Sequence, residues 1–165
     1  MDRLFQEITI AAENGLFYLA LFGALALPDI CGGMESADGH ANDKKYTDWF
    51  DKWVAAKYNG MVSGLDCYGF RCSLLHQARA RPHKGNFSRV IFLEPNSRGI
   101  YMHCNVLNDA LNLDIGTFCR DMVDSARVWF PTVESTPEFK ANMSTFMTRH
   151  PNGIAPYIVG MPVIG

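Results

Sequence analysis

The chain has 165 residues, of which 48% are hydrophobic and 19% charged, and its formal net charge at pH 7 is −2. This length fits a single domain, residues 1–165, with a sizeable core, and the composition excludes a disordered chain. Without a global positive charge, any contact with nucleic acid must use a local basic patch. The five cysteines show no regular spacing, which indicates free thiols in a cytoplasmic protein rather than a disulfide framework.

The first expected element is a helix over residues 2–27. Its second half, from Gly15 to Leu27, is an unbroken apolar run that is shorter than the roughly 20 residues needed to span a membrane. Pro28 is expected to end this helix or to open a short extra turn. Because acidic residues precede the run, it does not resemble a signal peptide. We expect a central core helix that is packed on all sides, and no membrane segment.

A second helix is expected over residues 45–58. Its apolar residues recur at the spacing of one helical face, with Asp48 and Lys52 positioned to pair on the outer face. The face comprises Tyr46, Trp49, Phe50, Trp53 and Val54.

The polar loop before this helix, residues 35–43, is a weak candidate for a cation site. Its acidic and imidazole side chains match the spacing of no known metal motif, so we expect a solvated loop and predict neither a metal nor a cofactor. The residues concerned are Glu35, Asp38, His40 and Asp43.

A third helix is expected over residues 63–80, ending before Pro82. It has two apolar sides, which indicates burial between two neighbours. The remaining polar strip contains Arg71, Ser73, His76 and Gln77.

Residues 87–105 change to the composition of β-strands. β-Branched and aromatic residues fill 87–93 and 100–104, and turn-forming residues occupy 95–99. We expect a β-hairpin that lies on the helices or pairs with another chain, because two strands alone are marginally stable.

Two further helices are expected near the C-terminus. One has Asp114 as its N-cap and ends at Pro131, and the other starts at Thr136 and closes near His150. The tail, residues 154–165, is apolar but interrupted by Pro and Gly, so it should extend over the core or over a partner. The fold class is therefore mainly α: a single-domain helical bundle of about five helices with one inserted β-hairpin.

Arg71 and His76 are the candidate catalytic residues. Five residues on a helix turn the direction by about 140° and rise by about 7.5 Å, so the side chains diverge, but a long arginine can bend back toward the imidazole. In a metal-free ribonuclease, His76 would transfer protons and Arg71 would hold the phosphate. The alternative interpretation is structural: Arg71 pairs with an acid such as Asp66, and His76 caps a backbone carbonyl.

A basic cluster follows the helix that carries His76. If the pair acts on RNA, the cluster would bind the flanking phosphates. Alternatively, its charges complement the helix dipole and bind nothing. The cluster comprises Arg79, Arg81, His83, Lys84 and Arg89.

The Arg-x4-His signature within a helix of a small helical domain resembles the HEPN superfamily. The resemblance implies a ribonuclease whose dimer places two copies of Arg71 and His76 at one interface. Two positions differ from patterns common in that superfamily, namely Cys72 directly after the arginine and Ala78 two places after the histidine. Four further runs, ALPDICGGMES, WFDKWV, FRCSLLHQ and ALNLDIGTFC, resemble those of a widespread bacterial family of uncharacterised small proteins. This resemblance spans most of residues 17–130 and implies no activity.

Two classes of function follow. The first is a HEPN-like, metal-independent endoribonuclease with RNA as substrate. The second is a non-enzymatic binding or regulatory module with a protein partner, in which Arg71 and His76 are structural. In either case we expect a homodimer, because the apolar tail, the hairpin and the aromatic content exceed what a domain of this size easily buries.

Overall fold

The computed structural model describes residues 1–82, 84–96 and 98–165, so His83 of the predicted basic cluster and Ser97 of the predicted turn lie outside the described residues. The mainly α-helical class is confirmed. In chain order the elements are α1 (Asp2–Glu13), α2 (Phe17–Met34), α3 (Asp43–Trp53), the 3-10 helix η1 (Ala55–Tyr58), α4 (Gly64–Gln77), β1 (Arg89–Leu93), β2 (Asn105–Leu107), β3 (Ala110–Asp114), α5 (Ile115–Val133), α6 (Pro137–Met143), β4 (Arg149–His150), β5 (Gly153–Ile154), β6 (Ile158–Val159) and β7 (Val163–Ile164).

The single helix expected over residues 2–27 is wrong, because two helices occupy this segment. α1 ends at Glu13, with Asn14 as its C-cap, and the next residue, Gly15, has a φ of +73°. The Leu16 N–H donates to the Ala11 carbonyl at 2.8 Å, and the Gly15 N–H donates to the Ala12 carbonyl. This Schellman arrangement favours glycine, since a Cβ would be strained at a positive φ.

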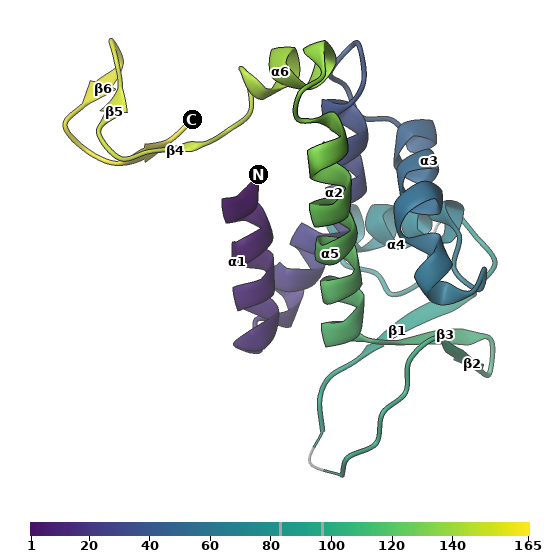
Figure 1. Ribbon diagram of the computed structural model, residues 1–165. Helices are drawn as coiled ribbons and strands as arrows, with labels where there is room; N and C mark the ends of the chain where they lie inside the picture. Colours follow the sequence, from purple (N-terminus) through teal and green to yellow (C-terminus); the bar gives the residue numbers. More distant parts are fainter. Residues whose placement is uncertain (83, 97) are drawn as a thin grey trace.

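α2 is the central helix, as expected, and it contacts α1, α3, α4, α5 and α6. In Figure 1, α1 lies on one side of it and α3 and α4 on the other. A Cβ at Gly23 would lie 2.6 Å from the Ile8 side chain of α1, so glycine is needed for this close packing. The expectation that Pro28 ends the helix is wrong: α2 continues to Met34. Proline removes one backbone hydrogen bond, and the surrounding packing maintains the helix.

α2 is also long and apolar enough to cross a membrane. More than half of it is buried inside the structure, however, and the core helix of a soluble protein has the same properties. The structure is therefore compatible with a soluble protein.

The apolar face expected for α3 is confirmed, because Tyr46, Trp49 and Phe50 are buried. Trp49 meets Trp129 of α5 edge to face, with 6.2 Å between the ring centroids. Such aromatic pairs favour this geometry and dominate the energetics of a small core. This contact joins α3 to α5, and α5 also packs on α1 and α2.

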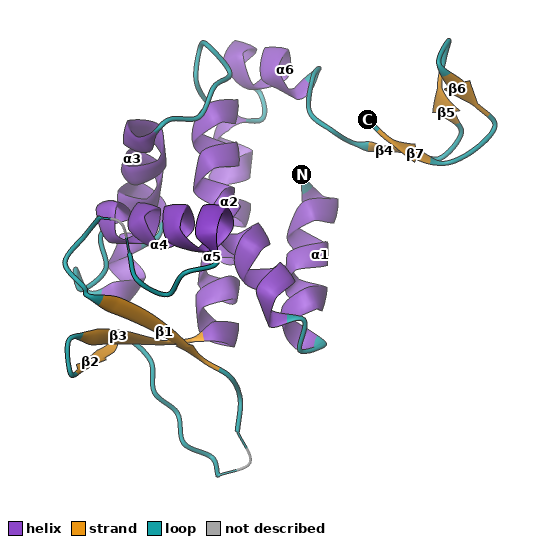
Figure 2. Cartoon of the chain, turned by 180° about the vertical axis from the view of Figure 1, so that it is seen from behind, coloured by secondary structure: helices purple, strands orange, loops and turns teal. Residues whose placement is uncertain are grey.

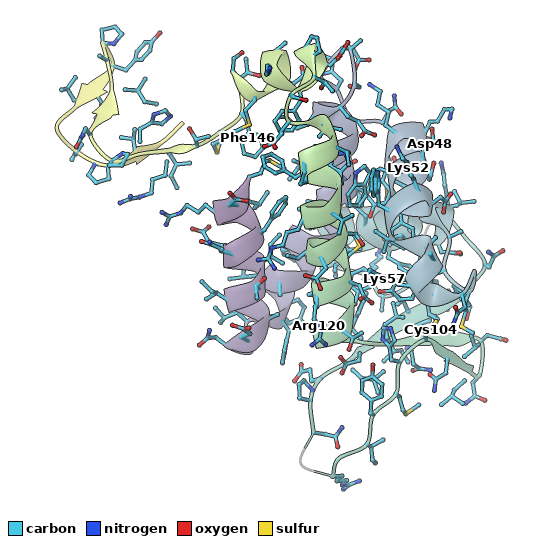
Figure 3. The ribbon with its side chains drawn as sticks, viewed as in Figure 1. Asp48, Lys52, Lys57, Cys104, Arg120 and Phe146 are labelled. Atoms are coloured by element: carbon cyan, nitrogen blue, oxygen red, sulfur yellow. The ribbon has the colours of Figure 1, made fainter. Side chains whose placement is uncertain are left out.

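The ion pair expected between Asp48 and Lys52 is wrong. Both residues lie on the outer side of α3 (Figure 3), but Asp48 pairs with Lys44, at 2.5 Å. The Lys52 ammonium lies 4.8 Å from the centroid of the Trp53 ring instead. The helix offers Asp48 a lysine one turn away in each direction, and spacing alone does not choose between them.

The hairpin expected between residues 87–93 and 100–104 is wrong in its pairing. β1 pairs in parallel with β3, and β2 pairs with β3 in an antiparallel ladder. Residues 100–104 form no strand and belong to the long connection between β1 and β2, which Figure 2 shows extending away from the helices. A parallel pair needs such a crossover connection, so the turn-forming residues at 95–99 do not reverse the chain into a partner strand.

Residues 148–165 form a C-terminal arm. β4 pairs with β7 and β5 with β6, so the arm folds on itself. Figures 1 and 2 both show it projecting from the helices, and Phe146, labelled in Figure 3, packs against the core just before it. Tyr157 and Val159 are 82% and 73% exposed. The expectation that the tail lies over the core of its own chain is therefore wrong, whereas a partner for it stays a prediction.

Candidate active site

α4 carries both residues of the predicted catalytic pair, and its first turn is fixed by a capping box. The Asp66 N–H donates to the Ser63 hydroxyl, and the Asp66 carboxylate accepts the Ser63 N–H. Asp66 is fully buried and also accepts the Asn86 N–H at 2.6 Å. Asp66 is therefore not the partner of Arg71, but the structural interpretation is right that Arg71 pairs with an acid, which is Asp29.

Arg71 bends back toward His76, as the long side chain permits. Arg71 Nη1 lies 2.8 Å from His76 Nε2. A guanidinium has only donors, so Nε2 accepts this hydrogen bond and the proton of the neutral ring lies on Nδ1. His76 is exposed and caps no backbone carbonyl of the described chain, which contradicts the structural interpretation of this residue.

Asp29 of α2 is a third member of this site. Its Oδ2 accepts a hydrogen bond from Arg71 Nε at 2.7 Å, and the two side chains are 14% and 21% exposed. Burial raises the pKa of Asp29, and the charge and hydrogen bond of Arg71 lower it by less. Burial lowers the pKa of Arg71, but the charges and hydrogen bonds of Asp29 and Cys72 together raise it more, so its pKa lies above its ordinary value. Arg71 is thus a permanent cation that Asp29 holds in place.

The sequence contains a signal for Asp29, although Asp29 belongs to no motif. Asp29 is the only charged residue between Gly15 and Met34. A carboxylate isolated in an apolar core helix requires a hydrogen-bonded cation, because an unpaired buried charge is strongly unfavourable. This reasoning predicts a buried basic partner, although it does not choose among the arginines.

Among the described residues of the basic cluster, Lys84 shares a neighbour, Tyr68, with Arg71. Its ammonium is 5.5 Å from the centroid of the Tyr68 ring, and the Arg71 guanidinium carbon is 5.9 Å from the same centroid. Lys84 also pairs with Asp43 at 3.6 Å. The backbone of Lys84 packs directly on α4, where a Cβ at Gly69 would lie 2.2 Å from the Lys84 carbonyl oxygen.

The structure does not bring the other arginines of the basic cluster to this site. Arg79 and Arg89 line a separate surface hollow, here called the α4–β1 groove, together with Leu74 of α4. His76 is two residues beyond Leu74 on the same helix and therefore points about 160° away from it. Arg81 is exposed and forms no ion pair within the described ranges.

Three surface hollows among the described residues can be compared with the positions of the catalytic candidates. Arg71 and His76 line neither the α4–β1 groove, nor the hollow between α1 and α5, nor the one beside α6. Asp29 lines the hollow beside α6. In the Asp29–Arg71–His76 cluster, His76 is therefore exposed on the surface, and the Asp29–Arg71 ion pair beneath it is largely buried.

The polar loop before α3 does not gather its acids around one point. Asp38 pairs with Lys45, and Asp43 pairs with Lys84. Glu35 accepts a hydrogen bond from the indole of Trp129 at 2.7 Å. Over residues 1–82, 84–96 and 98–165, no group of three or more His, Cys, Asp or Glu side chains is placed to hold a metal ion.

Asp29 should make stability depend on pH in a defined direction. The pKa of Asp29 is raised in the folded chain above the ordinary 3.8. The contribution of Asp29 to the free energy of unfolding is therefore greatest below pH 3.8 and is lost as the pH rises through the folded-state pKa. In Asp29→Asn the amide oxygen still accepts from Arg71, and this dependence disappears. Urea unfolding of both proteins between pH 3 and pH 7 should show wild type gaining stability relative to Asp29→Asn as the pH falls. The matched control is Asp48→Asn, which removes an exposed carboxylate. A difference that grows in favour of wild type as the pH rises would contradict the prediction.

Searches against protein-family models, curated proteins and solved structures found no match to this chain. The resemblances to the HEPN superfamily and to a bacterial family therefore stay predictions that depend on residues of the sequence, chiefly those of α4.

Proposed function

We propose that this protein is a metal-independent, HEPN-like endoribonuclease that acts as a homodimer, with two copies of the Asp29–Arg71–His76 cluster at one interface. The observation that supports this most is the 2.8 Å contact between Arg71 Nη1 and His76 Nε2 on an exposed part of α4. A permanent cation and an imidazole, whose Nε2 can accept a proton once Nη1 releases it, are thereby within reach of a single phosphodiester.

In the proposed reaction, His76 Nε2 removes the proton of an RNA 2′-hydroxyl, whose oxygen attacks the adjacent phosphorus. The bond from phosphorus to the 5′-oxygen breaks, and that oxygen takes a proton from the partner subunit's His76, which enters the reaction protonated. The products end in a 2′,3′-cyclic phosphate and a 5′-hydroxyl. Arg71 stabilises the charge that develops on the phosphoryl oxygens. Lys84, with a side chain that is 42% exposed, contacts a flanking phosphate.

The homodimer is part of this proposal because one histidine per chain supplies a base but no separate acid. The exposed apolar side chains of the C-terminal arm support association between two copies. All five cysteines are free thiols, which supports a reducing, cytoplasmic location.

A second candidate is a non-enzymatic binding or regulatory module with a protein partner. It is favoured by the largely buried Asp29–Arg71 ion pair, which joins α2 to α4 and would serve a structural purpose without any reaction. In this candidate the hydrogen bond from Arg71 to His76 is a surface contact that stabilises the end of α4.

Wild-type protein is expected to cleave unstructured RNA in the presence of excess EDTA, because the proposed chemistry uses only side chains. A DNA oligonucleotide of the same base sequence is the matched control and should stay intact, since it lacks the 2′-hydroxyl. Gel analysis of end-labelled oligonucleotides, with mass spectrometry of the products, measures both outcomes. Cleavage of the DNA, or loss of RNA cleavage in EDTA, would contradict the proposed reaction.

A further inference from the structure

The α4–β1 groove is a second candidate site, separate from the Asp29–Arg71–His76 cluster. It has a volume of about 310 Å³ and lies between α2, α4, β1 and the first residue of α5. This volume is near the lower end of the range of about 300–1,000 Å³ that is typical of small-molecule pockets. The groove can therefore accommodate a small ligand.

The walls of the groove are apolar. Leu21 of α2, Phe70 of α4, Val90 of β1 and Ile115 of α5 line it, and all four are almost completely buried. Tyr18 also lines the groove but is 72% exposed, so its ring stands at the opening. An apolar portion of a ligand would displace water from these walls, which favours binding in proportion to the buried area.

Two arginines stand at this apolar groove because of the way the chain leaves α4. Ala78 takes a φ of +50°, which ends the helix and turns the chain toward β1. The Val90 N–H then donates to the Ala80 carbonyl at 3.1 Å, so the segment after α4 lies beside the strand. This contact brings Arg79 and Arg89 to the same groove.

The charge at the groove is unbalanced. Arg79 and Arg89 are exposed and form no ion pair within the described residues, and Glu94 is the one acidic side chain among the residues that line the groove. Two guanidinium groups and one carboxylate leave one positive charge beside an apolar wall. A ligand that complements this arrangement has an apolar body and a single negative charge, and guanidinium groups bind carboxylates in a bidentate geometry.

We propose that the α4–β1 groove binds a small amphipathic monocarboxylate, with a free medium-chain fatty acid as the class of ligand. The aliphatic chain lies against the apolar walls, and the carboxylate is held by Arg79 and Arg89. This site is independent of the proposed ribonuclease activity, because His76 lies on a different side of α4.

The test is calorimetric titration of the full-length protein with octanoate, with 1-octanol and octylamine as probes of equal chain length. Octanoate is expected to bind saturably, 1-octanol at least about tenfold more weakly, and octylamine not measurably. Arg79→Gln and Arg89→Gln should each weaken octanoate binding about tenfold. Arg81→Gln removes a neighbouring exposed arginine that does not line the groove, and it should leave binding unchanged.

Ile91→Glu provides a variant that does not depend on the arginines. Ile91 lines the groove and is 40% exposed, so a glutamate there should be tolerated by the fold and should repel the carboxylate. Equal affinity for octanoate and 1-octanol, an equal effect of Arg81→Gln and Arg89→Gln, or no binding of octanoate would overturn the proposal. Single-stranded RNA that displaces octanoate and is weakened equally by Arg79→Gln and Arg89→Gln would assign the groove to RNA and would also overturn it.

Discussion

His76→Ala is expected to abolish RNA cleavage and to leave the melting temperature nearly unchanged. The imidazole is exposed, and its hydrogen bond is to Arg71, so its removal costs little packing and leaves no buried polar group unsatisfied. Removal of a general base or acid typically lowers a rate by about 10²–10⁴-fold, and here the same residue serves both roles in a dimer. His40→Ala is the matched control, because His40 is also exposed but lies in the loop before α3. It should cleave RNA like wild type.

Arg71→Lys should also lose cleavage, for a different reason. Arginine uses Nε for Asp29 and Nη1 for His76, whereas a lysine ammonium is a single point that cannot reproduce both contacts and hold a phosphate. The ammonium of the substituted side chain can still pair with Asp29. The melting temperature of Arg71→Lys should therefore fall only slightly, whereas RNA cleavage should be lost. If wild type is inert toward varied RNAs and both variants change only the melting temperature, the enzymatic proposal is wrong and the binding module is favoured.

Removal of the C-terminal arm is expected to convert a dimer into a monomer with an intact fold. The arm makes its strand pairs within itself, so a chain ending at residue 147 retains every helix of the core. The arm also carries much of the exposed apolar surface, including Tyr157, Val159 and Ile164, and such surface marks sites of association. Light scattering over a range of concentrations measures the mass, and circular dichroism verifies that the helices remain.

A full-length variant with Tyr157→Ser and Val159→Ser is the matched control for the truncation, because it keeps the length of the arm and removes its apolar side chains. It should dissociate as the truncated chain does, and RNA cleavage should fall with it. A full-length protein that is monomeric at high concentration, or a truncated chain that is still a dimer, would contradict the role of the arm and weaken the shared active site.

Helices with a regular apolar face could be predicted from the sequence. For helices of mixed or uniformly apolar composition, the hydrophobic pattern did not indicate the first and last residues. The faces of α3 and α5 are buried as their spacing indicates. In residues 2–34 the end of α1 is marked by Asn14-Gly15, a helix-stop dipeptide at the start of the apolar run, but the run itself resembles a continuation of the helix. Pro28 does not end α2, since tertiary packing outweighs one missing hydrogen bond.

The sheet could be predicted only in part, because strand composition is local and strand pairing is not. β1 lies within the expected strand 87–93, but its neighbour β3 is separated from it by the whole connection that includes β2. Leu111 and Leu113 of β3 alternate with polar residues too briefly to indicate a strand beside the start of a helix. Likewise, the spacing of Arg71 and His76 within one helix indicated their contact, whereas Asp29 reaches Arg71 from another helix, and no local pattern specifies that pair.

The hydrogen-bonding capacity of Arg71 has a consequence for how the site could respond to an anion. Nε is committed to Asp29 and Nη1 to His76 and Cys72, whereas the two N–H groups of Nη2 have no partner among the described side chains. An incoming oxyanion can therefore be received by Nη2 while the link between α2 and α4 stays closed. The imidazole, in contrast, regains its lone pair only when Nη1 turns away. Anion binding at Nη2 and release of the imidazole from Nη1 are therefore two separate events on one guanidinium group.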